Sequence, residues 1–185
     1  MSSYVRRLLR AARLEPEIYE EVEADRTATV QALCTVVLSS LAAAVGATGQ
    51  EAGLRAAALA AAGALALWVV WAAVIWFVGT RVLPEPQTRS DVGELLRTTG
   101  FAAAPGLLRV LGIVPILAVP VAIVVTFWML AAMVVAVRQA LDYAGTWRAV
   151  FVCGLGLIAY FGVVVVVGVL LGATEALFEF VVGRA

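Results

Sequence analysis

Five polar residues lie within or between long apolar stretches, and their types and spacing could do chemistry: Arg109, Arg138, Asp142, Tyr143 and Arg148. Arg138 and Asp142 are four residues apart, so on one helix they would share a face and pair their charges. Asp142 could also reach Arg148 across a short turn. We expect a clamp that fixes two neighbouring helices, and a surface for docking another protein is the alternative. An exposed pair of this kind contributes only about 0–1 kcal/mol.

Arg109 is the one charged residue in the 40 residues from Thr98 to Val137. A guanidinium at the centre of a membrane helix costs about 2.5–3.5 kcal/mol on insertion scales, so it must reach water, an interface or a polar partner. We expect the side chain to extend to the far interface. A buried polar cluster or a solute pathway is the alternative. No acid lies at comparable depth in the predicted spans, so an internal salt bridge has no evident partner.

The residues needed for most enzymatic chemistry are missing. The sequence has no histidine, and Cys34 and Cys153 stand alone in separate apolar stretches. These facts exclude a histidine-activated nucleophile, an imidazole metal ligand and a Cys-x-x-Cys centre. The 13 basic residues, all arginine, balance 13 acids, so general nucleic-acid binding has no electrostatic basis. We expect no catalytic, cofactor-binding or metal-binding residues and no enzymatic activity.

The elements that position these polar residues must be membrane helices. Of the 185 residues, 63% are hydrophobic and 14% are charged, too few charges to cover a water-facing surface. Four stretches of 24 to 28 residues carry no charge: 27–50, 56–80, 110–137 and 149–174. A helix needs about 20 residues to cross a ~30 Å hydrocarbon layer, and a segment in lipid must satisfy its own backbone groups. The fold class is therefore all-α, a polytopic membrane protein.

We predict a five-helix transmembrane bundle over residues 27–174, with spans at about 28–47, 56–78, 98–114, 116–137 and 150–172. The 40 residues 98–137 could instead make a single crossing, with residues 98–114 as a re-entrant segment. A cytoplasmic N-terminus with five crossings places ten arginines inside and two outside, against nine and three for four crossings, so the positive-inside rule slightly favours five. Candidate helix breaks are Gly100, Pro105, Gly106, Pro115 and Pro120. A Gly-x-x-x-Gly pair marks a candidate helix contact at Gly168 and Gly172.

Short interfacial helices are expected beside the bundle. Residues 1–26 form a cytoplasmic segment, with a cationic amphipathic helix over 4–13 and an acidic helix whose first turn holds Pro16. Asp91 and Glu94 have the spacing of a capping box, so a short helix should begin there and lead to the third span. Residues 175–185 should form a tail on the far side.

Segments in a fixed order resemble the Yip domain family, whose eukaryotic members interact with Ypt/Rab GTPases, and especially its prokaryotic branch. The likeness covers about residues 15–172 and is carried by Tyr19–Asp25 leading through Thr29–Ala32, Gly100–Gly106 with a following proline turn, Trp128 ahead of Ala136–Tyr143, and Thr146–Ala149. The resemblance implies a five-span bundle with a cytoplasmic N-terminus, a far-side C-terminus and a non-enzymatic role.

The expected function is that of a membrane organiser or adaptor in the plasma membrane. A small-solute transporter or channel subunit is the alternative, supported by Arg109 and the membrane prolines. Expected partners are the lipid bilayer and either a second copy or other membrane proteins, with no nucleic acid and no cofactor. The sequence alone does not support a GTPase partner.

Overall fold

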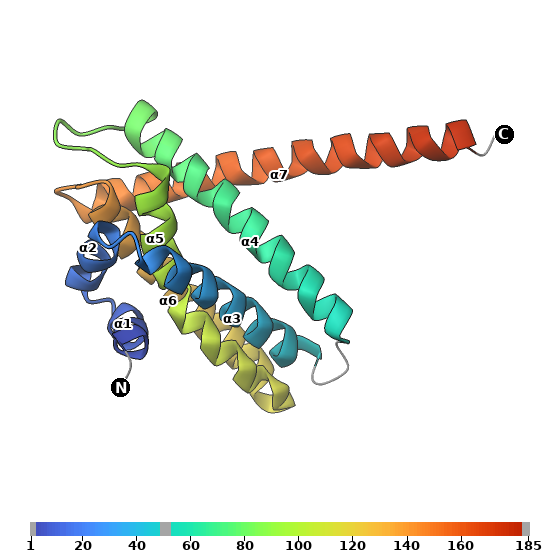
Figure 1. The fold of residues 1–185 in the computed structure, drawn as a ribbon, viewed down its shortest axis with the longest axis horizontal. Helices are drawn as coiled ribbons and strands as arrows, with labels where there is room; N and C mark the ends of the chain where they lie inside the picture. The colour runs from blue at the N-terminus through green and yellow to red at the C-terminus, as the bar shows by residue number, and fades with distance from the viewer. Residues whose placement is uncertain (1–2, 49–52, 183–185) are drawn as a thin grey trace.

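The computed structural model describes residues 3–48 and 53–182, with the surroundings of the side chains at 3–47, 53 and 55–169. All regular elements in these ranges are helical (Figure 1). They are α1 (Ser3–Ala12), α2 (Pro16–Ala24), α3 (Ala28–Thr48), α4 (Leu54–Phe77), the π-helix η2 (Val78–Val82), α5 (Val92–Ala102), the 3-10 helix η3 (Ala104–Ile113), α6 (Pro115–Ala140) and α7 (Thr146–Val182).

Four of these helices are long and apolar enough to cross a membrane: Ala28–Ala47, Arg55–Val82, Pro115–Ala140 and Thr146–Val169. They coincide with four of the five predicted spans. The outer face of α6 is typical, because Val119, Ile123 and Phe127 recur at helical spacing and are 67%, 53% and 68% exposed. Within the described ranges no helix covers this stripe, which is suited to contact with lipid, and the chain is an integral membrane protein in contact with the bilayer.

The predicted third span, residues 98–114, is not one helix. α5 ends at Ala102, and Pro105 follows at the start of η3. Proline has no backbone N–H to donate to an α-helical ladder, and from Ala104 the chain has the tighter 3-10 geometry. η3 lies alongside α3, and a Cβ placed on Gly46 would overlap the carbonyl oxygen of Arg109.

The other candidate break residues have different roles. Pro115 is the first residue of α6, where its missing N–H is not needed. α6 is continuous through Pro120, so the helix is not broken there. Gly100 lies inside α5, close to the Cβ of Ala32 in α3, and Gly106 lies against Ser39 of the same helix. These two glycines permit close packing of α5 and η3 on α3.

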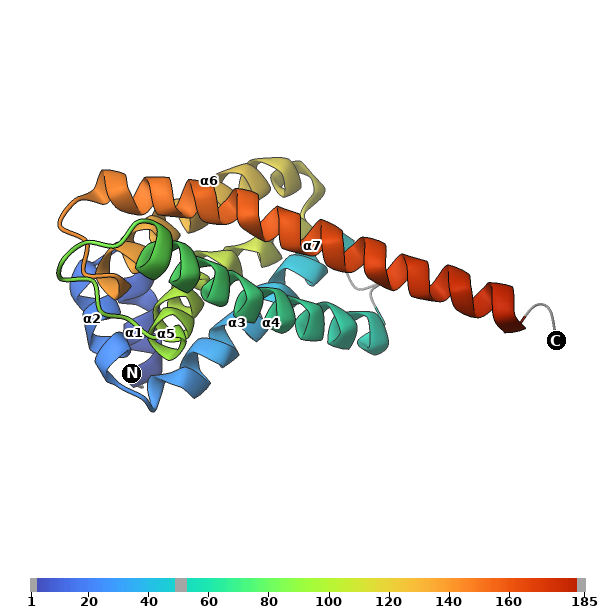
Figure 2. The same cartoon turned by 90° about the horizontal axis from the view of Figure 1, so that it is seen from above.

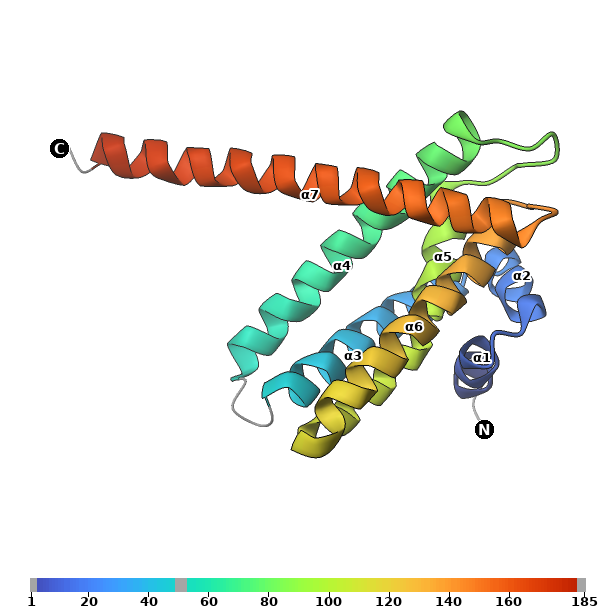
Figure 3. The same ribbon diagram turned by 180° about the vertical axis from the view of Figure 1, so that it is seen from behind.

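The polar segments gather at one end of the bundle, which we call the proximal end (Figures 1 and 3). It holds α2, the connection 83–91 and the turn 141–145. The distal end holds the end of α3 and the η3–α6 junction, where the backbones of Gly46 and Gly112 approach each other closely. α7 starts at the proximal end and extends beyond the other helices (Figure 2).

The predicted short helices are present. Pro16 opens α2, and the capping box at Asp91 and Glu94 begins α5 with both of its hydrogen bonds formed. The predicted tail lies largely in α7, which continues to Val182. Residues 183–185 lie outside the described residues.

α1 and α2 form a cap on the proximal half of the bundle. Ile18, Tyr19 and Val22 of α2 are fully buried in a cluster with Phe101 of α5 and Ala136 of α6. Charges join the two cap helices through the following ion pairs: Arg7 with Glu21 at 2.8 Å and with Asp25 at 2.9 Å, and Arg10 with Glu15 at 2.7 Å and with Glu21 at 2.8 Å. The arginines of α1 that face α2 are thus neutralised within the chain.

Candidate functional site

Tyr143 and Arg148 join the α6–α7 turn to the end of α4. The Tyr143 hydroxyl lies 3.0 Å from the carbonyl oxygen of Gly79 and 2.9 Å from that of Leu83. The Arg148 guanidinium donates to the carbonyl oxygens of Leu83 at 3.3 Å and Pro84 at 2.8 Å, and it lies 3.5 Å from the Glu85 carboxylate. We call these contacts the clasp.

The π-helix η2 makes this arrangement possible. Its wide turn closes with a bond from the Leu83 N–H to the Val78 carbonyl, five residues earlier, and the Gly79 carbonyl accepts from Tyr143 instead. Gly79 packs against the side chain of Leu141, with no room for a Cβ. Burial raises the pKa of Tyr143 to about 12, so its hydroxyl remains a donor at neutral pH.

The predicted ion pair between Arg138 and Asp142 is absent from the described residues. α6 ends at Ala140, and Asp142 has a positive φ of 52°, so the two side chains do not share a helix face. Arg138 instead donates to the carbonyl oxygens of Tyr143 at 3.3 Å and Ala144 at 3.4 Å. The predicted Asp142–Arg148 contact is also absent there, because Arg148 pairs with Glu85.

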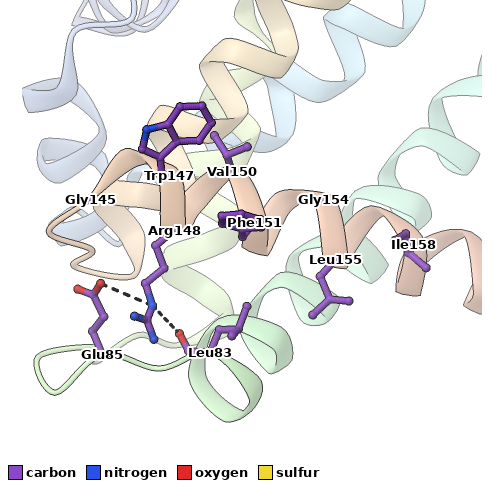
Figure 4. A pocket seen from close by; sticks show the side chains of 10 residues that line it. All are labelled: Leu83, Glu85, Gly145, Trp147, Arg148, Val150, Phe151, Gly154, Leu155 and Ile158. Carbon is purple, nitrogen blue, oxygen red and sulfur yellow. Dashed lines mark hydrogen bonds and ion pairs between the residues drawn. The ribbon is translucent and has the colours of Figure 1, made fainter.

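A groove of about 980 Å³ runs beside the clasp. Figure 4 shows Arg148 directed toward Glu85 and Leu83, with Trp147 and Phe151 on α7. Trp147 is 77% exposed and Phe151 is 69% exposed. Exposed aromatic residues beside charged ones are typical of a membrane–water interface.

A buried arginine that the sequence patterns did not single out attaches α2 to α5. Arg97 is only 7% exposed, and its guanidinium donates to the carbonyl oxygens of Val22 at 3.1 Å and of Glu23 at 2.6 Å. Those carbonyls end α2 and have no partner within their own helix. The sequence feature that could have indicated this role is the position of Arg97, the last charge before the apolar stretch that begins at Thr98.

Glu23 lies in an acidic surrounding at the same junction. Burial raises the pKa of its carboxyl to about 7, and the charges of Glu94 and Asp142 add to the shift.

Gln139 of α6 donates to Glu20 of α2 at 2.7 Å. The cap therefore contacts both α5 and the proximal end of α6.

Arg109 lies on η3, away from the clasp. Its guanidinium donates to the Thr126 hydroxyl at 3.3 Å, and Thr126 is near the middle of α6 (Pro115–Ala140). That this side chain extends to the far interface stays a prediction. Arg109 and Thr126 line a cavity of about 350 Å³ between the helices.

The Gly-x-x-x-Gly pair of Gly168 and Gly172 lies on α7. Gly168 lies on α7, and a Cβ added to it would meet no atom within 4 Å. The side-chain surroundings of Gly172 lie outside the described residues. No group of three His, Cys, Asp or Glu residues that could hold a metal ion occurs in the described ranges.

Comparison with known proteins agrees with this architecture. The model of the Yip1 domain family matches residues 16–166, from the start of α2 to well inside α7. No curated protein and no solved structure matches the chain. Members of the matched family are generally non-enzymatic membrane proteins. The match covers most of the chain, which therefore belongs to the Yip1 domain family.

Proposed function

We propose that this chain is a non-enzymatic membrane organiser or adaptor of the prokaryotic branch of its family. We also propose that it lies in the plasma membrane with its proximal end in the cytosol. The observation that carries the proposal is the cap. α1 and α2 are fixed to the bundle by buried apolar side chains and by Arg97. A cap that is already folded is suited to binding a second protein without further folding.

The exposed side of the cap supplies the contact surface in this proposal. Glu17 and Glu20 are exposed on α2, while Glu21 and Asp25 are paired with arginines of α1. A basic protein surface is the partner that the exposed carboxylates of α2 favour.

The proposed topology has five crossings. α5 and η3 together are long enough for the third, since 11 α-helical residues rise about 16 Å and ten 3-10 residues about 20 Å, against a ~30 Å core. The contacts of α5 at the proximal end and of Gly112 with Gly46 at the distal end support this path. The end of α7 then lies on the far side.

Site-specific photocrosslinking in cells tests the adaptor role. A photoreactive amino acid at Glu17 should give discrete protein adducts, and the same group at Val119, on the outer face of α6, should give none. The adducts at Glu17 should disappear when Glu20 is changed to Arg. If Glu17 gives no protein adduct in membranes from the native host, the adaptor proposal is wrong.

A small-solute transporter or channel is the second candidate, favoured by the Arg109 cavity. Proteoliposomes that contain only the purified chain separate the two roles. The adaptor proposal expects solute flux equal to that of empty liposomes, and flux that depends on Arg109 would favour the transporter.

A further inference from the structure

The cavity at Arg109 is an open one between the helices of the bundle, and side chains from all the long elements line it. Its volume is about 350 Å³, within the range of sites for small ligands. Its apolar wall includes Trp68 and Trp71 of α4 and Met133 of α6, and the ring of Tyr160 of α7 meets that of Trp71 edge to face. Arg109 also lines a second cavity of about 460 Å³ near the distal end, beside Gly46 and Gly112.

Several N–H and O–H groups line the cavity, and its lining includes no carboxylate. Arg109 carries five guanidinium N–H groups, and its one hydrogen bond in the described residues is the contact of 3.3 Å with Thr126. The indole of Trp71 donates to the sulfur of Met133 at 3.2 Å, and a thioether is a weak acceptor. The Tyr160 hydroxyl makes no hydrogen bond within the described part of the chain.

The charge of Arg109 has no counter-ion in the described part of the chain, where none of the ion pairs includes it. An arginine remains protonated in proteins, and a lone cation at this depth is unfavourable in hydrocarbon. An anion that entered the cavity would be bound by charge-assisted hydrogen bonds. The apolar wall would hold an aliphatic chain attached to that anion.

We propose that this cavity is a binding site for a single-chain amphiphile with an anionic head, either a carboxylate or a phosphate monoester. The head pairs with the guanidinium of Arg109, and the chain lies against Trp68, Trp71 and Met133. The proposal goes beyond the adaptor role and does not depend on it, because it concerns the open cavity between the membrane helices and not the cap.

Titration of the purified protein in a neutral detergent tests the proposal. Dodecanoate and dodecyl phosphate should each bind once per chain, while dodecanol and inorganic phosphate should bind at least about tenfold more weakly, since each lacks the charge or the chain. Equal binding of dodecanol would show that Arg109 does not select the ligand, and equal binding of inorganic phosphate would identify a small-anion site. Either result overturns the proposal.

Variants locate the site. R109Q should weaken binding of dodecyl phosphate about tenfold or more, and R109K should retain part of it. The matched control is R6Q, which removes an exposed arginine of α1 and should leave binding unchanged. Unchanged binding by R109Q would overturn the proposal.

A second measurement needs no variant and so does not depend on the folding of R109Q. A fatty acid that carries a photoreactive diazirine on its chain should label Trp68, Met133 or Leu157, which line the cavity. Labelling confined to lipid-facing residues such as Val119 and Ile158, 67% and 72% exposed, would overturn the proposal.

Discussion

The indole nitrogen of Trp128, in α6, donates a hydrogen bond of 2.7 Å to the carbonyl oxygen of Ala12, the last residue of α1. The final carbonyls of a helix have no partner within it, so a side chain near the middle of a membrane helix completes the end of α1. Tyr4, near the start of α1, lies 3.1 Å from the Thr35 hydroxyl of α3. Both ends of α1 are thus held against the bundle.

Replacement of Trp128 with Phe should loosen α1. The ring is largely retained, but the N–H donor is lost, at a cost of about 1 kcal/mol. Hydrogen exchange of the amides of α1 should become faster. Trp76→Phe is the control, because that indole donates to Ser90. Equal exchange of α1 in Trp128→Phe and the native protein would contradict a role for Trp128 in holding it.

The close approach of η3 to α3 depends on Gly46. A Cβ at this position would overlap the backbone of Arg109, and backbone cannot move aside as a side-chain end can. Gly46→Ala should therefore destabilise the protein by about 1–3 kcal/mol, measured as a lower melting temperature in detergent. Gly63→Ala in α4 is the control, since a Cβ there meets nothing within 4 Å. Equal melting temperatures of the two variants would be evidence against the packing.

The clasp predicts a specific role for the Tyr143 hydroxyl. Tyr143→Phe leaves the carbonyls of Gly79 and Leu83 without this donor, which should cost about 1–3 kcal/mol. Tyr160→Phe is the matched control, because the Tyr160 hydroxyl makes no hydrogen bond in the described residues. Thermal unfolding of both variants in detergent checks the prediction, and loss of stability only in Tyr160→Phe would contradict it.

Glu23 predicts a pH dependence of the cap. Burial, with the charges of Glu94 and Asp142, raises the pKa of this carboxyl from 4.5 to about 7. The protonated Glu23 carboxyl therefore contributes to the stability of the folded protein. This contribution is fully present below about pH 4.5 and is lost as pH rises through about 7. The charged and polar groups that surround Glu23 are Glu20, Glu94, Arg97 and Asp142.

Glu23→Gln should remove this dependence. At pH 8 the variant should be more stable than the native protein by about 1–2 kcal/mol, less than the full shift implies, because solvent screens a partly exposed group. At about pH 4.5 the two should have similar stability. Melting temperatures in detergent across this range provide the measurement, with Glu17→Gln, exposed on α2, as the control. If the difference in melting temperature between the native protein and Glu23→Gln is the same from pH 4.5 to pH 8, the raised pKa of Glu23 is contradicted.

The sequence predicted the elements that depend on local rules. Four spans followed from charge-free length, α2 from Pro16 and α5 from the capping box of Asp91 and Glu94. The hydrophobic pattern could not predict that residues 98–114 change geometry after Ala102, since proline at 105 permits either a kink or a new helix type.

The partners of the polar side chains were harder to predict. The pairing of Arg138 with Asp142 assumed that the helix continued, and it ends two residues before Asp142. Arg97 and Arg148 bind backbone carbonyls of segments far away in the chain, which no spacing rule reveals. The direction of Arg109 depends on where η3 places it opposite Thr126.

Cysteine labelling from outside intact cells tests the central claim most directly, the five-crossing path with a cytosolic cap. In a chain with Cys34 and Cys153 changed to Ala, single cysteines at Gly53 and Ile113 mark the distal end, and one at Gly145 marks the proximal end. A membrane-impermeant maleimide should label Gly53→Cys and Ile113→Cys but not Gly145→Cys until the membrane is permeabilised. Labelling of Gly145→Cys in intact cells would contradict the account. Protection of Ile113→Cys in intact cells would contradict it as well.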